Sequence, residues 1–202
     1  MIDYNIEQFF FLFDLYEDIY DWLATRTPLN HAYKRTFKIY NDRIWKKLND
    51  KIEELENKDS LNDLEKDFLK CRYKGKAYRI INYSNRKKGH IYSIEFAQSC
   101  SKTLKGINKV KNCGEVLLIE LKAELKAIDV FELLMFMYAN GLINDKNEGE
   151  YRSFQNLKRY FNEEEIVMPM NKENILDVSV YDLYNNKVIC KINKENWFRN
   201  DM

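Results

Sequence analysis

The chain contains very little proline, glycine, histidine or cysteine. Its 202 residues include 2 prolines, 6 glycines, 2 histidines and 4 cysteines. So few prolines and glycines exclude a collagenous chain and a glycine-rich linker. The histidines lie far apart in the sequence and the cysteines form no Cys-x-x-Cys pair, so we expect no metal site. Scattered cysteines are also typical of proteins in a reducing compartment.

The N-terminal segment lacks the features of a signal peptide and of a membrane span. Residues 1–23 read MIDYNIEQFFFLFDLYEDIYDWL, in which acidic residues interrupt the apolar ones and no cationic stretch comes first. A signal peptide or a spanning helix needs a longer apolar run with different flanks. We therefore expect a cytoplasmic protein that does not associate with a membrane.

Apolar residues are abundant. The chain is 45% hydrophobic and 14% aromatic with a formal net charge of +1, which excludes a disordered protein. A chain of this length supports one good core with an appended subdomain. All glycines lie at or after Gly75, so the first part differs in composition from the rest. We expect a helical subdomain in residues 1–72 and a second, strand-rich part in residues 73–202.

Hydrophobic periodicity predicts helices first and mostly antiparallel strands afterwards, an α+β fold. Helices are expected at 4–24, 30–56, 60–70 and 128–140. The second helix has one apolar stripe made of Ala32, Phe37, Tyr40, Ile44, Leu48, Ile52 and Leu55. Ser60 is the expected N-cap of the third helix, with Asp63 as its acidic third position, and Gly141 is the expected stop of the last. Strands are expected at 77–83, 91–97, 115–121, 165–169, 176–183 and 187–192, the last two joined in a hairpin through Asn185-Asn186.

Positive charge is concentrated in one segment. Residues 68–114 contain twelve Lys and Arg but a single acidic residue, Glu95. Such an asymmetry predicts that this segment meets an anionic ligand or partner. The alternative is that acidic segments of the same chain neutralise it internally.

Three short patterns occur in a suggestive order. Arg79 stands in an expected strand, the Ser-x-Ser of Ser99 and Ser101 follows an aromatic strand, and Glu163-Glu164-Glu165 runs into an apolar strand. With thirteen residues between Ser-x-Ser and the strand EVLLIEL, the arrangement resembles the mono-ADP-ribosyltransferases of the Arg, Ser-x-Ser, Glu-x-Glu class. The chain length and the helical N-terminal part look most like the small bacteriophage members.

The resemblance implies a core of two packed, mostly antiparallel sheets that binds NAD and transfers ADP-ribose from it to a protein. It also implies that Arg79, Ser99 and Ser101 contact NAD. Independently of the family, the planar, permanently charged fork of Arg79 suits phosphate oxygens, and the hydroxyl of Ser99 can bridge a ribose and a carboxylate. Tyr83 and Tyr92 are the candidates for stacking on nicotinamide.

Two glutamates are expected to divide the chemistry. In extended backbone, Glu163 and Glu165 would point to the same side, roughly 6–7 Å apart. We assign Glu165 to the nicotinamide ribose, where its charge would stabilise the oxocarbenium-like transition state, and Glu163 to the incoming nucleophile. By the resemblance, the pair of glutamates favours arginine as acceptor, since a protonated guanidinium needs an anionic partner to react. Tyr160 and Phe161 lie in the segment that corresponds to the family's loop for recognising the acceptor protein. The expected acceptor is a cytosolic host protein, and proteins associated with nucleic acid are among the candidates.

Two other functions are consistent with the sequence. The chain could be a non-catalytic protein whose basic segment, residues 68–114, binds nucleic acid or an acidic protein. It could also be an interaction module, such as an immunity or inhibitor protein, that acts through its acidic helices. NAD affinity distinguishes the transferase from both.

Overall fold

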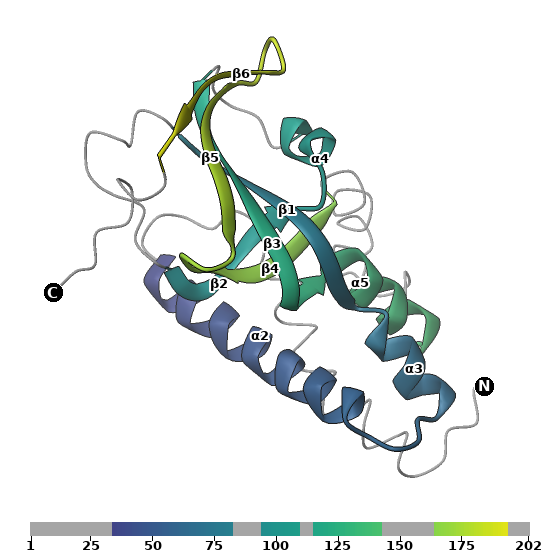
Figure 1. The fold of residues 1–202 in the computed structure, drawn as a ribbon. Helices are drawn as coiled ribbons and strands as arrows, with labels where there is room; N and C mark the ends of the chain where they lie inside the picture. The colour runs from purple at the N-terminus through teal and green to yellow at the C-terminus, as the bar shows by residue number, and fades with distance from the viewer. Residues whose placement is uncertain (1–33, 83–93, 110–114, 143–163, 194–202) are drawn as a thin grey trace, which may run out of the picture. The chain divides into compact units, whose positions relative to one another are not determined.

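The computed structural model describes residues 34–82, 94–109, 115–142 and 164–193 (Figure 1). The helix expected at 4–24 lies outside these ranges. The described helices are α2 (Lys34–Glu56), α3 (Asp63–Leu69), α4 (Leu104–Lys109) and α5 (Val130–Ala139). The described strands are β1 (Arg72–Asn82), β2 (Ile94–Ser101), β3 (Glu115–Asp129), β4 (Glu165–Met170), β5 (Ile175–Asp182) and β6 (Lys187–Ile192).

The chain divides into two compact units. Of the described residues, the first unit contains 34–72 and 128–142, and the second contains 73–82, 94–109, 115–127 and 164–193. The first boundary between the units falls between Arg72 and Tyr73. The sequence did not indicate that α5 returns to the helical unit, because its apolar residues suit any core.

The first unit is built on the apolar stripe of α2. Ile44, Leu48, Ile52 and Leu55 are each at most 1% exposed, which confirms the described part of the stripe. Helix α3 contacts both α2 and α5. Within this core the ring of Phe68 meets a second phenylalanine, Phe136, edge to face with the centroids 5.2 Å apart.

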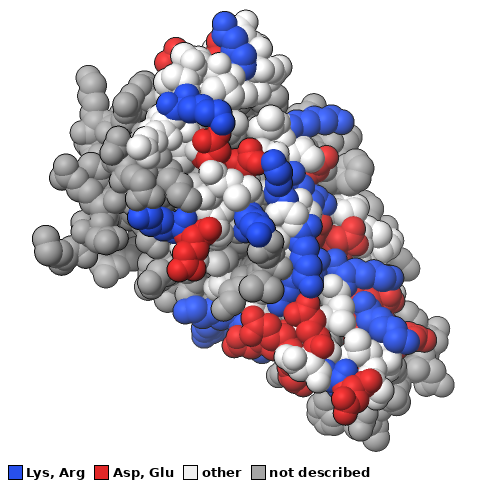
Figure 2. All heavy atoms as spheres, in the orientation of Figure 1, with Lys and Arg blue, Asp and Glu red and all other residues white. Residues whose placement is uncertain are grey.

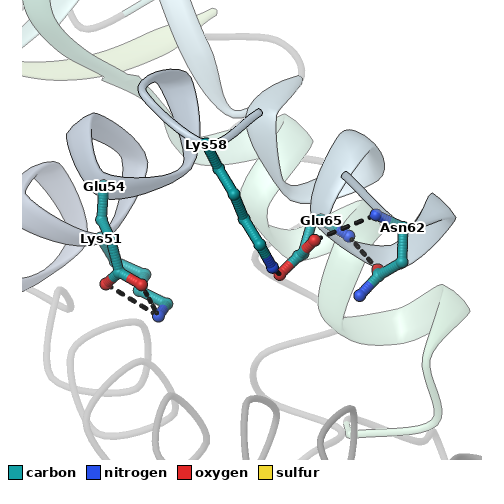
Figure 3. A network of polar contacts seen from close by, with 5 residues as sticks. All are labelled: Lys51, Glu54, Lys58, Asn62 and Glu65. Carbon is teal, nitrogen blue, oxygen red and sulfur yellow. Dashed lines mark hydrogen bonds and ion pairs between the residues drawn. The ribbon is translucent and has the colours of Figure 1, made fainter. Parts of the chain in front are cut away.

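The N-terminus of α3 differs from the prediction. Asn62, not Ser60, is the N-cap: its side chain accepts a hydrogen bond from the Glu65 N–H at 2.9 Å, and the Glu65 carboxylate accepts one from the Asn62 N–H at 3.0 Å (Figure 3). Lys58 also donates to Glu65 at 2.8 Å. Burial raises the pKa of Glu65, but the hydrogen bonds from Lys58 and Asn62 outweigh it and hold the pKa below its ordinary value. Asn62 is followed three residues later by Glu65, the residue type that completes a capping box, whereas Ser60 is followed by Asp63.

The capping box leads to a stability prediction with an internal control. Asn62→Ala is expected to lower the free energy of unfolding by about 1 kcal/mol, because it leaves an N-terminal N–H of α3 without its acceptor. Ser60→Ala, two residues earlier, should change it by less than about 0.5 kcal/mol, since Ser60 is exposed. Urea denaturation followed by circular dichroism measures both. An equal effect of the two substitutions would contradict the assignment.

Helix α5 begins and ends at polar caps. Its N-cap Asp129 accepts hydrogen bonds from the N–H groups of Phe131 and Glu132. The N–H of Asp129 itself donates to the Cys71 carbonyl at 2.8 Å. After the helix, Gly141 has a φ of 68°, which confirms the expected glycine stop.

The second unit is a six-stranded sheet in the order β1-β2-β4-β3-β5-β6, with β1 also paired to β3 (Figure 1). The pairings β1–β2, β2–β4, β3–β5 and β5–β6 are antiparallel, as expected. The predicted α+β class is therefore confirmed for the described residues. The expected division into two packed sheets is not seen in their hydrogen bonding, because the 15-residue β3 joins β1, β4 and β5.

Two apolar clusters lie on the sheet. One gathers residues of β1 to β5, among them Ala77, Cys100, Ile119, Ile166 and Val178. The other holds Ile107 of α4 with residues of β3 and β5 and, at its margin, Tyr78 and Ile80 of β1. The β5–β6 hairpin turns at Asn186, whose φ of 50° confirms the expected asparagine turn.

Candidate functional site

The three sequence patterns meet on neighbouring strands. Arg79 lies in β1, and Ser99 and Ser101 are at the C-terminal end of β2. Glu165 is the first residue of β4. Since β2 pairs with both β1 and β4, residues separated by 66 positions in the sequence become neighbours. The Ser-x-Ser residues were expected after their strand, and the structure places them within it.

Glu165 and Ser99 form the centre of the site. The Ser99 hydroxyl donates a hydrogen bond to Oε1 of Glu165. In the antiparallel register Glu165 lies opposite Ser101, and Ser99 opposite Val167, so Ser99 and Glu165 are diagonal neighbours on one face. Glu165 is 6% exposed whereas Ser99 is exposed, so the hydrogen bond joins a buried carboxylate to a serine at the surface.

Arg79 contacts the backbone of the same strand. Its Nη1 donates to the main-chain carbonyl of Ser99, which ties the guanidinium to the serine that holds Glu165. Among the described residues, no hydrogen-bond acceptor meets Arg79 Nε, which is buried. A buried donor without a partner is uncommon in folded proteins and calls for an explanation such as a ligand.

The middle residue of Ser-x-Ser faces the core. Cys100 is 6% exposed and belongs to the larger apolar cluster. Burial raises the pKa of the Cys100 thiol to about 11; the charge of Arg79 opposes this rise and that of Glu165 adds to it. The thiol is protonated at neutral pH and is not a nucleophile.

Ser101 is used locally. Its hydroxyl donates to the Thr103 carbonyl at 2.9 Å and accepts from the Thr103 N–H at 3.3 Å, closing a turn that leads into α4. It is 4% exposed. Its expected contact with a ligand stays a prediction, whereas its contact with the turn is direct.

The backbone before Glu165 is not extended. Glu164 has a φ of 48°, in the left-handed region, and β4 begins only at Glu165. The expected extended backbone is therefore wrong at Glu164, and the same-side placement of Glu163 and Glu165 stays a prediction. Glu163 itself lies outside the described residues.

The turn between β2 and α4 contains two residues, Lys102 and Thr103, that the sequence analysis did not assign to the site. The Thr103 hydroxyl donates to Oε2 of Glu164, and the Lys102 N–H donates to the Glu164 carbonyl at 2.9 Å. Thr103 Oγ1 also accepts from the Gly106 N–H at 3.1 Å, as a helix cap does. The available signal was a threonine directly before α4, but nothing in the sequence connects it with Glu164.

The remaining candidate residues lie outside the described ranges. They are the two proposed nicotinamide-stacking residues and the two proposed acceptor-reading residues: Tyr83, Tyr92, Tyr160 and Phe161. Within the described ranges, no group of three or more His, Cys, Asp or Glu side chains is placed to hold a metal ion. None of the described helices is both long and apolar enough to cross a membrane.

Several cations of the basic segment have acidic partners. Lys70 pairs with Asp67 at 2.6 Å, and Lys76 pairs with Glu120 at 2.5 Å. On the face drawn in Figure 2, acidic side chains adjoin the Lys and Arg side chains. Internal neutralisation therefore accounts for part of the charge asymmetry seen in the sequence.

Comparisons of the chain with protein-family models, with curated proteins and with solved structures found no match.

Proposed function

We propose that the protein is a mono-ADP-ribosyltransferase that transfers ADP-ribose from NAD to a protein, with release of nicotinamide. The observation that carries this proposal is the hydrogen bond from Ser99 to the buried carboxylate of Glu165, beside Arg79 on the adjoining strand. These are the three residue types that the resemblance to the transferase family singled out. They lie on the three neighbouring strands β1, β2 and β4.

Glu165 suits the bond-breaking step. As the bond between nicotinamide and ribose breaks, positive charge develops on the ribose, and a fixed carboxylate next to it stabilises that charge. Glu165 is mostly withdrawn from water, which strengthens such an interaction, and the hydrogen bond from Ser99 fixes the direction of its carboxylate. Nicotinamide then leaves with the electron pair of the broken bond.

Arg79 suits the diphosphate end of NAD. One of its N–H groups is occupied by the Ser99 carbonyl, and Nε is buried without an acceptor in the described part of the chain. A phosphate or ribose oxygen could provide that acceptor. In this proposal Arg79 binds the ligand and the backbone of β2 at the same time.

The acceptor is proposed to be an arginine of a cytosolic host protein. A guanidinium stays protonated at neutral pH, so it needs a nearby carboxylate to take its proton as it attacks the ribose. Glu163 is the proposed base, with Tyr160 and Phe161 as contacts to the acceptor protein. The proton passes to Glu163 and the new bond forms between the arginine nitrogen and the ribose carbon.

Labelled NAD tests the proposal. The full chain is incubated with NAD labelled on the adenine side and with a host lysate, and both protein labelling and nicotinamide release are measured. Label transfer that needs Glu165 supports the function. Neither label transfer nor nicotinamide release with excess NAD would reject it. Nucleic-acid binding that falls steeply with salt, without NAD affinity, would favour the binding-protein alternative.

Arg79→Lys is expected to weaken NAD binding about tenfold although the charge is kept. One ammonium group cannot contact the Ser99 carbonyl and a phosphate oxygen with the geometry of a guanidinium, and the loss of a hydrogen bond to a charged group corresponds to about this factor. Isothermal titration with NAD measures the change, and Lys74→Arg on the same strand is the control. An unchanged dissociation constant would show that Arg79 only supports the strand.

A further inference from the structure

Glu164 has an unusual backbone conformation at the entrance to β4. Its φ of 48° is in the left-handed region, which glycine and asparagine adopt readily and glutamate rarely does. Such conformations persist where surrounding contacts impose them, and they are concentrated at functional sites. The residue that follows is Glu165, the proposed catalytic carboxylate.

The contacts that impose this conformation come from the turn between β2 and α4. The Lys102 N–H binds the Glu164 carbonyl at 2.9 Å, and the Thr103 hydroxyl binds the Glu164 carboxylate. Thr103 is itself held, since its Oγ1 accepts from the Gly106 N–H and its N–H contacts Ser101. Glu164 is therefore bound through both its main chain and its side chain.

The turn and the catalytic strand are linked at both ends. Ser99 and Ser101 lie just before the turn, and each meets Glu165: Ser99 by a hydrogen bond and Ser101 as its partner in the strand register. Glu164 directly precedes Glu165, so its contacts with Lys102 and Thr103 hold the first residue of β4 beside Ser101 and Ser99. Loss of these contacts would loosen the start of β4 and, with it, the carboxylate of Glu165.

We propose that Thr103 and Glu164 are positioning residues that aim Glu165 at the nicotinamide ribose. This inference rests on the proposed function, because it assigns to the pair an effect on the turnover of NAD. The hydrogen bond between the two side chains keeps Glu164 in the left-handed region. This conformation in turn keeps the Glu165 carboxylate hydrogen-bonded to Ser99. Neither Thr103 nor Glu164 needs to touch the substrate.

The test compares matched variants at both positions. Thr103→Val removes the hydroxyl at nearly constant volume, and Thr103→Ser keeps it. Glu164→Ala removes the carboxylate and disfavours the positive φ, and Glu164→Gln keeps an oxygen that can accept the hydrogen bond. Thermal denaturation of each variant shows whether it is folded, and nicotinamide release by the full chain gives kcat and KM for NAD.

Thr103→Val and Glu164→Ala are expected to lower kcat by about 10- to 100-fold, the range that a small misplacement of a catalytic group produces, with little change in KM. Thr103→Ser and Glu164→Gln should retain most of the rate. The double variant Thr103→Val/Glu164→Ala should be no slower than about the worse single variant, because both substitutions remove one interaction. Folded Thr103→Val and Glu164→Ala variants with the wild-type kcat would overturn the inference.

Amide hydrogen exchange separates this inference from the proposed function. In Thr103→Val and Glu164→Ala, the Lys102 N–H should lose protection while amides in the β3–β5 pairing keep theirs. A wild-type chain that releases no nicotinamide rejects the proposed function, and the inference with it. If the wild-type chain releases nicotinamide, and the variants lose Lys102 protection but keep the wild-type kcat, the inference alone is rejected.

Discussion

Glu165→Gln is expected to lower both nicotinamide release and protein labelling by about 10²- to 10³-fold. The substitution keeps the volume and the ability to accept a hydrogen bond from Ser99, but it removes the negative charge that faces the developing oxocarbenium. Loss of one preorganised charge-stabilising group has this magnitude in enzymes. Both activities should fall together, because transfer and hydrolysis share the step in which nicotinamide leaves.

A control for this substitution is Glu120→Gln. Glu120 lies in β3 of the same unit, where it pairs with Lys76, and it lies outside the proposed site. Its loss removes the same charge and should change the rate little. If Glu165→Gln kept more than about a tenth of the wild-type rate, the catalytic charge would have to be elsewhere.

Asn49→Leu is expected to lower the free energy of unfolding by about 3 kcal/mol, which corresponds to a fall in Tm of about 6–12 °C. The Arg72 side chain is only 3% exposed, and its Nη1 donates to Asn49 Oδ1 at 2.5 Å. Its ion pair with Glu56 is long, at 3.7 Å, and Nε and Nη2 have no hydrogen-bond partner in the described part of the chain. Burial lowers the pKa of Arg72, which reflects the cost of keeping its charge away from water.

A double variant shows whether Arg72 is the cause. Leucine at position 49 leaves the buried guanidinium without its short hydrogen bond, so replacing the guanidinium as well should recover stability. We expect Asn49→Leu/Arg72→Met to be more stable than Asn49→Leu, since apolar replacement of a whole buried polar pair costs less than removal of one partner. Urea denaturation measures all three chains. A double variant less stable than Asn49→Leu would show that Arg72 stabilises the unit by other contacts.

Local patterns predicted most of the described elements. The stripe of α2 repeats at the helical period, so its buried side could be read directly. The strands EVLLIEL and KVICKI and the turn at Asn186 also follow from local preferences, because φ and side-chain branching act within a few residues. The N-cap of α3 was misplaced by two residues, since Ser60 and Asn62 have similar capping ability and the Glu65 side chain completes the capping box with Asn62.

The extension of β3 shows where local preference fails. The strand continues from Leu121 to Asp129 through LKAELKAI, whose Leu, Lys, Ala and Glu residues favour helices. Pairing with neighbouring strands outweighs that weak preference, because a paired strand gains ladder hydrogen bonds and buries some of its side chains. Ala123 and Ala127, for example, are at most 1% exposed.

For the candidate site, the sequence alone determined which residue types are present and in what order: Arg79, Ser99 and Glu165. Only the tertiary structure decided that Ser99 contacts Glu165, that Arg79 binds a backbone carbonyl, and that Glu164 is left-handed and held by Thr103. These contacts join residues 20 to 66 positions apart, so they depend on strand register. Register is set by how whole strands bury their apolar faces, which no short pattern encodes.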